Sequence, residues 1–105
     1  MNSPQLTHKT YAEFVSHNAL VAVHFWSTGN GWDREFRTDI AALAPDFPSI
    51  NFAEYCVDPN DHHQIAVSLS VTQVPFLALY RDGQLVASHS GKIQRNELCE
   101  YLNAF

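Results

Sequence analysis

The sequence has few cysteines, few basic residues and no long apolar run. Its two cysteines, Cys56 and Cys99, lie far apart, which excludes a disulfide framework, a Cys-x-x-Cys redox pair and a cysteine-rich zinc site. Six lysines and arginines stand against eleven acidic residues, a net charge of −5 at pH 7. No nucleic-acid partner is expected, because no basic stripe exists to neutralise phosphates. No stretch approaches the roughly 20 apolar residues of a membrane span, so we expect no membrane association.

What is present indicates one packed unit. The chain has 105 residues, 46% of them hydrophobic, which suits a single domain over residues 1–105 with its own core. The first ten residues lack the basic and apolar parts of a secretion signal. Two unpaired cysteines also fit a reducing compartment, so the expected location is the cytoplasm.

Apolar patterning predicts a sheet with helices packed on it. The nearly continuous apolar run over 20–26 is typical of a strand buried on both faces. Further strands are predicted at Leu6, 50–57, 76–80 and 85–89, the last two joined by a turn over 81–84. The order of elements predicts an α/β fold with a mixed sheet of four or five strands.

Helical periodicity recurs between these strands. Steps of three and four residues from Trp32 to Phe47 predict a long amphipathic helix, which Pro45 and Pro48 would end. A first helix is expected after a cap at Thr7 or Thr10. With this first helix, three shorter helices are predicted, and these residues face inward in them: Tyr11, Phe14 and Val15; Ile65, Ala66 and Leu69; and Leu98, Tyr101, Leu102 and Phe105.

From about Leu20 to Leu102, the order and spacing of several short motifs resemble the thioredoxin family. Phe25-Trp26 is similar to the Phe-Trp that ends the family's central strand, and Val74-Pro75 to its cis-proline. The family's intervals are also matched by Asp58, the Arg81-Asp82-Gly83 turn and Gly91. The resemblance implies the thioredoxin fold: a central mixed sheet flanked by helices on both faces, with a cis-proline at Pro75.

The family's active-site motif, Trp-Cys-Gly-Pro-Cys, corresponds here to Gly29-Asn30-Gly31-Trp32-Asp33. Its chemistry needs a thiolate at a helix N-terminus and a second thiol that resolves the mixed disulfide. An amide at Asn30 and a carboxylate at Asp33 can do neither, so we expect no disulfide exchange at this site. Asn30 and Asp33 suit the cap and first turn of a helix. Trp32 suits an exposed anchor on a contact loop.

The resemblance also implies a buried polar pair. The family's buried acid on the central strand corresponds to His24, and the lysine near it corresponds to Glu54. The two would be charge-paired if His24 is protonated and hydrogen-bonded if it is neutral, and we expect a structural role. Most other acids are expected at the solvated surface. His62 and His63 diverge by about 100° on a helix, so we do not expect them to hold a metal ion together. No cofactor is expected either.

Two functions of different classes follow. The first is a redox-inactive protein that binds another protein or an extended peptide, as a chaperone, maturation factor or scaffold, by backbone pairing beside the cis-proline. Its binding surface would comprise Trp26, Gly29, Asn30, Gly31, Trp32, Thr72, Gln73, Val74, Pro75 and Gly91. The alternative is an oxidoreductase-like enzyme that uses Cys56, Cys99 or a repurposed pocket. A relative that has lost any distinct task is a third reading.

Overall fold

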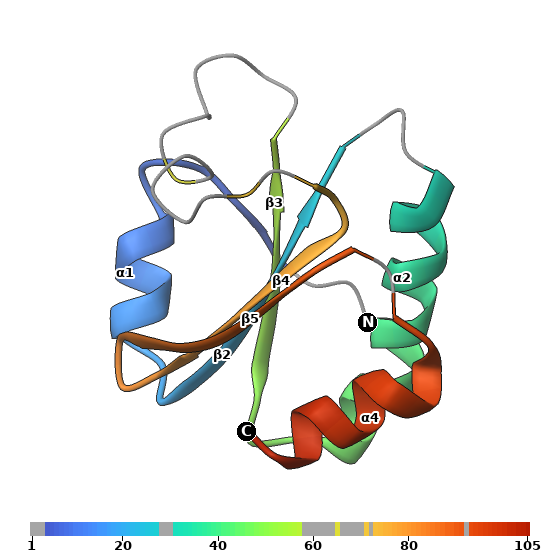
Figure 1. Cartoon of the computed structure of the whole chain (residues 1–105). Helices are drawn as coiled ribbons and strands as arrows, with labels where there is room; N and C mark the ends of the chain where they lie inside the picture. Colours follow the sequence, from blue (N-terminus) through green and yellow to red (C-terminus); the bar gives the residue numbers. More distant parts are fainter. Residues whose placement is uncertain (1–3, 28–30, 58–64, 66–70, 72, 92) are drawn as a thin grey trace.

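A five-stranded mixed sheet forms the centre of the computed structural model, which describes residues 4–27, 31–57, 65, 71, 73–91 and 93–105 (Figure 1). The sheet order is β1-β3-β2-β4-β5. Strands β1, β3 and β2 run parallel, whereas β4 is antiparallel to β2 and β5 to β4. The strands are β1 (Gln5–Leu6), β2 (Leu20–Trp26), β3 (Asn51–Cys56), β4 (Phe76–Arg81) and β5 (Gln84–Ser90). The α/β fold expected from the sequence is confirmed.

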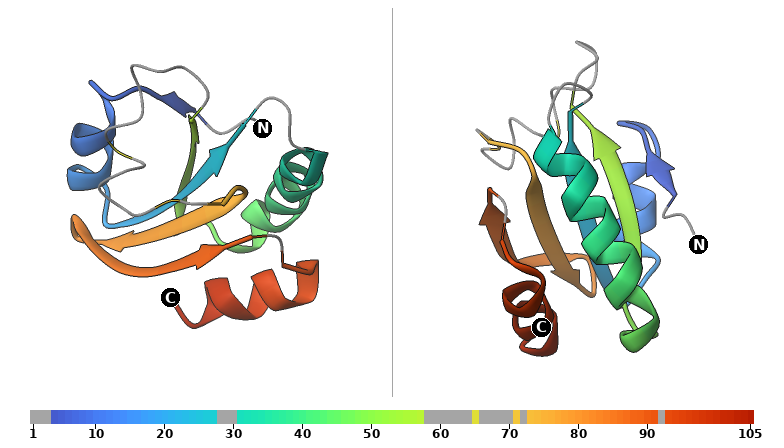
Figure 2. Two further views of the ribbon diagram at one scale, coloured as in Figure 1. Left: turned by 45° about the horizontal axis from the view of Figure 1, so that its top comes forward. Right: turned by 90° about the vertical axis from the view of Figure 1, so that its right-hand side faces the viewer.

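Helices cover both faces of this sheet. In the two views of Figure 2, α2 (Gly31–Leu43) and α4 (Arg95–Asn103) lie on one face and α1 (Tyr11–Ser16) on the other. Pro45 has no N–H to continue the α-helical ladder, and the chain tightens after Leu43 into the 3-10 helix η1 (Ala44–Asp46). Of the helix predicted around Ile65, Ala66 and Leu69, only Ile65 is among the described residues. No helix in the described ranges is long and apolar enough to cross a membrane.

The core is divided by the sheet into two apolar clusters. Successive side chains of a strand point to opposite faces, so Val21, Val23 and Phe25 of β2 pack on the α1 side. There they meet an aromatic group from α1, β3 and β4 that includes Tyr11 and Tyr80. The other cluster joins the sheet to α2 and α4 and contains Ala22, Phe36, Ile40, Leu43, Ile50, Leu77, Leu79, Ile93, Leu98 and Leu102. This packing fixes where α2 begins relative to β2.

A tight hairpin joins β4 to β5 at the rim of the sheet. Asp82 and Gly83 both have positive φ, 53° and 81°, as a two-residue type I′ turn requires. The turn predicted over 81–84 is therefore confirmed. Strand β5 is the last of the sheet, and Leu85 and Val86 on it are 46% and 47% exposed.

Candidate functional site

The candidate site lies at the carboxyl end of β2. Trp26 ends this strand beside Cys56 of β3, and Phe25 is paired with Phe76 at the start of β4. Pro75 directly precedes Phe76, so it belongs to the same end of the sheet. Figure 1 shows the ends of β2 and β3 and the start of α2 together at the top of the molecule.

Three of the predicted binding residues meet around Pro75. The Val74–Pro75 peptide bond is cis, and the Pro75 carbonyl accepts a hydrogen bond from the Gly91 N–H at 2.8 Å. Gly91 has a φ of 85°, and a Cβ atom there would approach the Gln73 side-chain nitrogen to 3.3 Å. Glycine therefore suits this position for both its backbone angle and its size. Gly29, Asn30 and Thr72, also predicted for this surface, lie outside the described residues.

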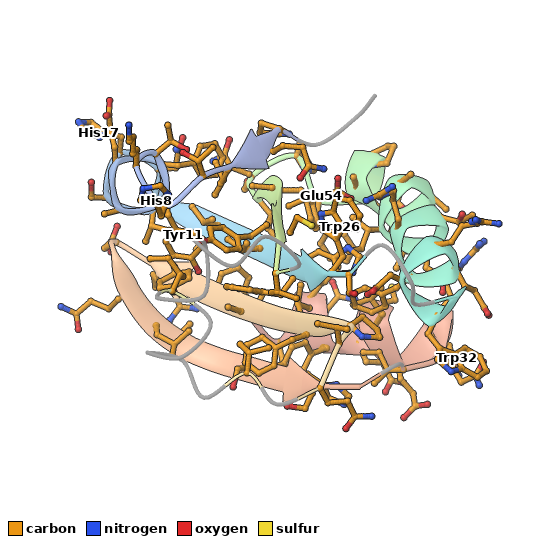
Figure 3. All side chains as sticks on the ribbon, turned by 90° about the horizontal axis from the view of Figure 1, so that it is seen from above. His8, Tyr11, His17, Trp26, Trp32 and Glu54 are labelled. Carbon is orange, nitrogen blue, oxygen red and sulfur yellow. The ribbon has the colours of Figure 1, made fainter. Side chains whose placement is uncertain are left out.

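The two tryptophans have different settings. Trp32, in the first turn of α2, is 59% exposed and projects outward at the edge of the molecule (Figure 3). Trp26 is only half-buried, yet it is held on two sides. Its indole N–H donates to Gln5 Oε1 at 3.2 Å, and the Arg37 guanidinium lies over its ring, 4.7 Å from the centroid. Trp32 thus presents apolar surface to solvent, and Trp26 links that end of the sheet to β1 and α2.

Asp33, which the sequence resemblance matches to the family's second cysteine, is buried, with the residue 3% exposed. One oxygen, Oδ2, accepts the Ser27 backbone N–H at 2.8 Å. The other, Oδ1, lies 3.2 Å from His24 Nε2. Sequence reasoning gave Asp33 a place in the first helical turn, which is correct, and missed its burial. The signal was available, because Asp33 falls three and seven residues before Phe36 and Ile40 on the apolar face.

The expected pair of His24 and Glu54 is part of a larger group. His24 is 1% exposed, and its Nδ1 lies 3.8 Å from Glu54 Oε2, which is too far for a hydrogen bond. Its Nε2 faces Asp33 instead, and its ring meets the edge of Phe36 at a centroid distance of 4.8 Å. The structure therefore joins His24 to two carboxylates, one on each side. We call His24, Asp33 and Glu54 the buried polar cluster.

Glu54 connects this cluster to the surface. Its Oε2 accepts a hydrogen bond from Arg37 Nε at 2.6 Å, and its Oε1 accepts one from the Gln5 side-chain amide. Burial raises the pKa of the Glu54 carboxyl, but the neighbouring His24 and Arg37 together outweigh burial, so the pKa lies below its usual value. Glu54 is therefore held ionised. Most of the described acids are exposed, as expected, and the buried exceptions are Asp33, Asp39 and Glu54.

Among the described residues, the buried polar cluster is made of an imidazole and two carboxylates and includes no thiol. Cys56 and Cys99 are half-buried and form no disulfide. Within the described ranges, no three His, Cys, Asp or Glu side chains are placed to hold a metal ion; His62 and His63 lie outside those ranges. The carboxylates, the guanidinium and the imidazole can hold backbone and side chains in place, and the carboxylates and the imidazole can also exchange protons.

An open apolar groove begins beside the cluster. It has a volume of about 720 Å³ and runs between α2 and the outer edge of β3. Arg37 and Glu54 line one end, and the walls are mainly apolar, with Ile40, Phe47 and Phe52 among them. Within the described part of the chain, this groove is a candidate for the repurposed pocket of the enzymatic alternative.

The sheet order, the cis-proline and the helix that starts beside it define a thioredoxin-fold protein. The chain belongs to the thioredoxin family, whose model matches residues 2–104. The resemblance seen in the sequence is thereby confirmed.

Relatives and solved structures agree with this assignment. Thioredoxin-like protein slr1139 of Synechocystis sp. is 32% identical over 83 residues, which cover 78% of this chain and 74% of that protein. Monothiol glutaredoxin-S17 of Arabidopsis thaliana is 30% identical over 73 residues, 70% of this chain; the match spans only 14% of that much longer protein.

Two thioredoxin structures illustrate the shared fold. Mitochondrial thioredoxin 3 of Saccharomyces cerevisiae in its oxidised form superposes with a TM-score of 0.87 at 22% identity, covering 98% of this chain and 95% of that one. Thioredoxin f2 of Chlamydomonas reinhardtii gives a TM-score of 0.88 at 19% identity over the same shares. The fold is thus retained at low sequence identity.

Proposed function

We propose that this thioredoxin-family protein binds another protein or an extended peptide at the carboxyl end of β2 without exchanging disulfides there. The observation that carries the proposal is Asp33. It stands where the resolving thiol would be needed, and both of its oxygens already face groups of the protein itself, the Ser27 N–H and the His24 ring. A buried carboxylate so engaged provides structure and no redox chemistry.

The features that would hold a peptide do not require cysteine. An extended segment can pair with the backbone of Gln73 and Val74 before Pro75, in the manner of β-augmentation. Gly91 is buried and leaves room for the Gln73 side chain, and exposed Trp32 supplies an apolar anchor. A role as chaperone, maturation factor or scaffold in the cytoplasm would use this surface.

A thiol-dependent enzyme is the second candidate, and the position of Cys56 favours it. Cys56 is the register partner of Trp26, so its thiol is at the same end of the sheet as the candidate site. The name of the plant relative, a monothiol glutaredoxin, points in the same direction, although this chain matches only a small part of that protein.

Replacing Trp32 by alanine tests the binding proposal. Peptides that bind would first be selected from an array of extended sequences, and affinity would then be measured by titration calorimetry. We expect Trp32→Ala to weaken binding about tenfold or more, since buried tryptophans dominate binding energies. The free energy of unfolding should change by less than about 0.5 kcal/mol, because the side chain is exposed in the isolated protein.

Leu85→Ala is the matched control for this experiment. Leu85 is also a large exposed apolar residue, but it lies on β5 next to the hairpin turn. Its loss should leave affinity unchanged. An equal loss of affinity in both variants would argue against a specific surface, and a strongly destabilised Trp32→Ala protein would make Trp32 a structural residue.

An insulin-reduction assay separates the two candidate functions. We expect no turnover above the background of the reductant for the native protein or for a Cys56→Ser/Cys99→Ser variant, because the sequence has no Cys-x-x-Cys pair that could form and resolve a mixed disulfide. Turnover in the native protein that disappears in the double variant would contradict the binding proposal and establish the enzymatic one.

A further inference from the structure

One nitrogen of His24 is left without a hydrogen bond inside the protein. Nδ1 is buried and has no partner in the described part of the chain. An ionised Asp33 can only accept, so the proton of a neutral imidazole belongs on Nε2, and Nδ1 then presents a lone pair. The group that faces this lone pair at 3.8 Å is the Glu54 carboxylate, another acceptor. Two acceptors facing each other in a dry site are an unfavourable arrangement.

The charges around His24 are also unbalanced when its ring is neutral. From α2 come Asp33, which is negative, and Arg37, which is positive and bound to Glu54. From β3 comes Glu54, which is negative. On the β4 side the register partner of His24 is apolar Leu77, and the Phe36 ring covers the imidazole from α2. These described groups sum to −1, so one proton on His24 would neutralise the cluster.

Glu54 contacts the two side chains that hold Trp26, a residue of the proposed binding surface. Its two oxygens hold Gln5 and Arg37. Gln5 in turn accepts the Trp26 indole N–H, and Arg37 lies over the Trp26 ring. Trp26 is therefore joined to the buried carboxylate by two separate routes.

We propose that His24 is a pH-dependent switch beneath the binding surface. Protonation of Nδ1 draws Glu54 toward the imidazole and, through Gln5 and Arg37, repositions Trp26. The effect on peptide binding rests on the function proposed above, whereas the coupling of His24 to Trp26 does not. Histidine suits this role because it is the side chain that ordinarily changes charge between about pH 5 and pH 8.

The step takes up one proton from water and breaks no covalent bond. The new Nδ1–H donates to Glu54 Oε2, and the two atoms close from 3.8 Å to about 2.8 Å, the usual length of a charge-assisted hydrogen bond. Nε2–H keeps its place beside Asp33. The imidazolium is then bound on both sides, and the cluster with Arg37 is neutral.

Nuclear magnetic resonance of the native protein tests the coupling directly. The imidazole nitrogens of His24 and the indole N–H of Trp26 would be followed together from about pH 5 to about pH 8. We expect the Trp26 resonance to shift with the same midpoint as protonation of His24 Nδ1. The indole N–H of Trp32, in the same spectra, should not follow that midpoint. A Trp26 resonance that stays fixed while His24 titrates would overturn the proposal.

Two substitutions identify the route. Glu54→Gln keeps the size of the side chain but removes its negative charge, so the Trp26 resonance should no longer follow His24. His89→Gln removes a different, partly buried histidine on β5 and should leave the coupling intact. Coupling that survives Glu54→Gln would exclude Glu54 as the transmitter. If Glu54→Gln does not fold, the titration of the native protein still decides.

Peptide affinity tests the link to function. With a peptide selected as above, we expect binding about fivefold tighter at about pH 5.5 than at about pH 8, since the completed cluster fixes Trp26 before the partner arrives. Equal affinities at both values would overturn the link to binding. If the Trp26 resonance follows the protonation of His24 but no peptide binds at any pH, the coupling of His24 to Trp26 is supported and the proposed peptide-binding function is contradicted.

Discussion

Asp33 shows how the helix start of this fold can hold a buried carboxylate in a structural role. The N-terminus of a helix favours negative charge, and in a redox-active relative that field lowers the pKa of a thiol. Here the same end of α2 holds a carboxylate that accepts the Ser27 N–H. The Asp33 carboxylate therefore links Ser27, the residue directly after β2, to the first turn of α2.

Glu54 makes the stability of the protein depend on acid. Its folded-state pKa lies below the ordinary value of 4.5, so its contribution is present above pH 4.5 and is lost as the pH falls through the lower, folded-state pKa. We expect Glu54→Gln to be about 2 kcal/mol less stable than the native protein at neutral pH, because hydrogen bonds between charged groups are lost. That difference should shrink on acidification below pH 4.5.

Urea unfolding at a series of pH values measures this effect. Glu100→Gln is the control for removing a carboxylate, since Glu100 lies on the exposed side of α4 outside its first turn, and its substitution should change the free energy of unfolding by less than about 0.5 kcal/mol. Parallel profiles for the native protein and Glu54→Gln below pH 4.5 would mean that Glu54 ionisation is not coupled to folding.

At the scale of elements, α1 is fastened to the sheet by one buried hydrogen bond within an aromatic group. The hydroxyls of Tyr11 on α1 and Tyr80 on β4 lie 2.8 Å apart, and both residues are buried. Burial raises the pKa of both phenols, so each remains a neutral hydroxyl that needs a partner. The two hydroxyls are hydrogen-bonded to each other, so both are satisfied.

A double-mutant cycle tests the fastening. Tyr11→Phe and Tyr80→Phe should each lower the free energy of unfolding by about 1–2 kcal/mol, because the remaining hydroxyl is left buried and unsatisfied. The double variant should lose about 1 kcal/mol less than the sum of the two. Strict additivity in chemical denaturation would show that the two hydroxyls do not interact.

The boundaries of elements were predictable to within a few residues wherever burial imposes a period. Strand β2 matches the predicted 20–26, and α2 carries Phe36, Ile40 and Leu43 on its buried face as predicted. Contacts between elements were not predictable in the same way. Arg95 of α4 donates to the buried Asp39 of α2 at 2.9 Å, and no local pattern relates these two distant positions.

For the whole molecule, the fold was more fully predictable from the sequence than the contacts of the candidate site. Periodicity records which face of an element is buried, and the spacing of Phe25-Trp26, Val74-Pro75 and Gly91 located the end of the sheet where the candidate site lies. Neither the periodicity nor the spacing of these motifs indicates which polar groups meet there. Gln5, Arg37 and Asp33 join the group around His24 and Glu54 only after β1, β3 and α2 have packed together.

The exposed last strand of the sheet has a consequence for the protein at high concentration. Strand β5 contains no lysine, arginine, acid or proline, the residues that usually keep one sheet edge from joining another, and it carries exposed Leu85 and Val86. The net charge of −5 supplies repulsion over only about a nanometre in physiological salt. Colloidal behaviour should therefore depend strongly on ionic strength, with added salt bringing uncapped sheets of neighbouring molecules within reach of each other.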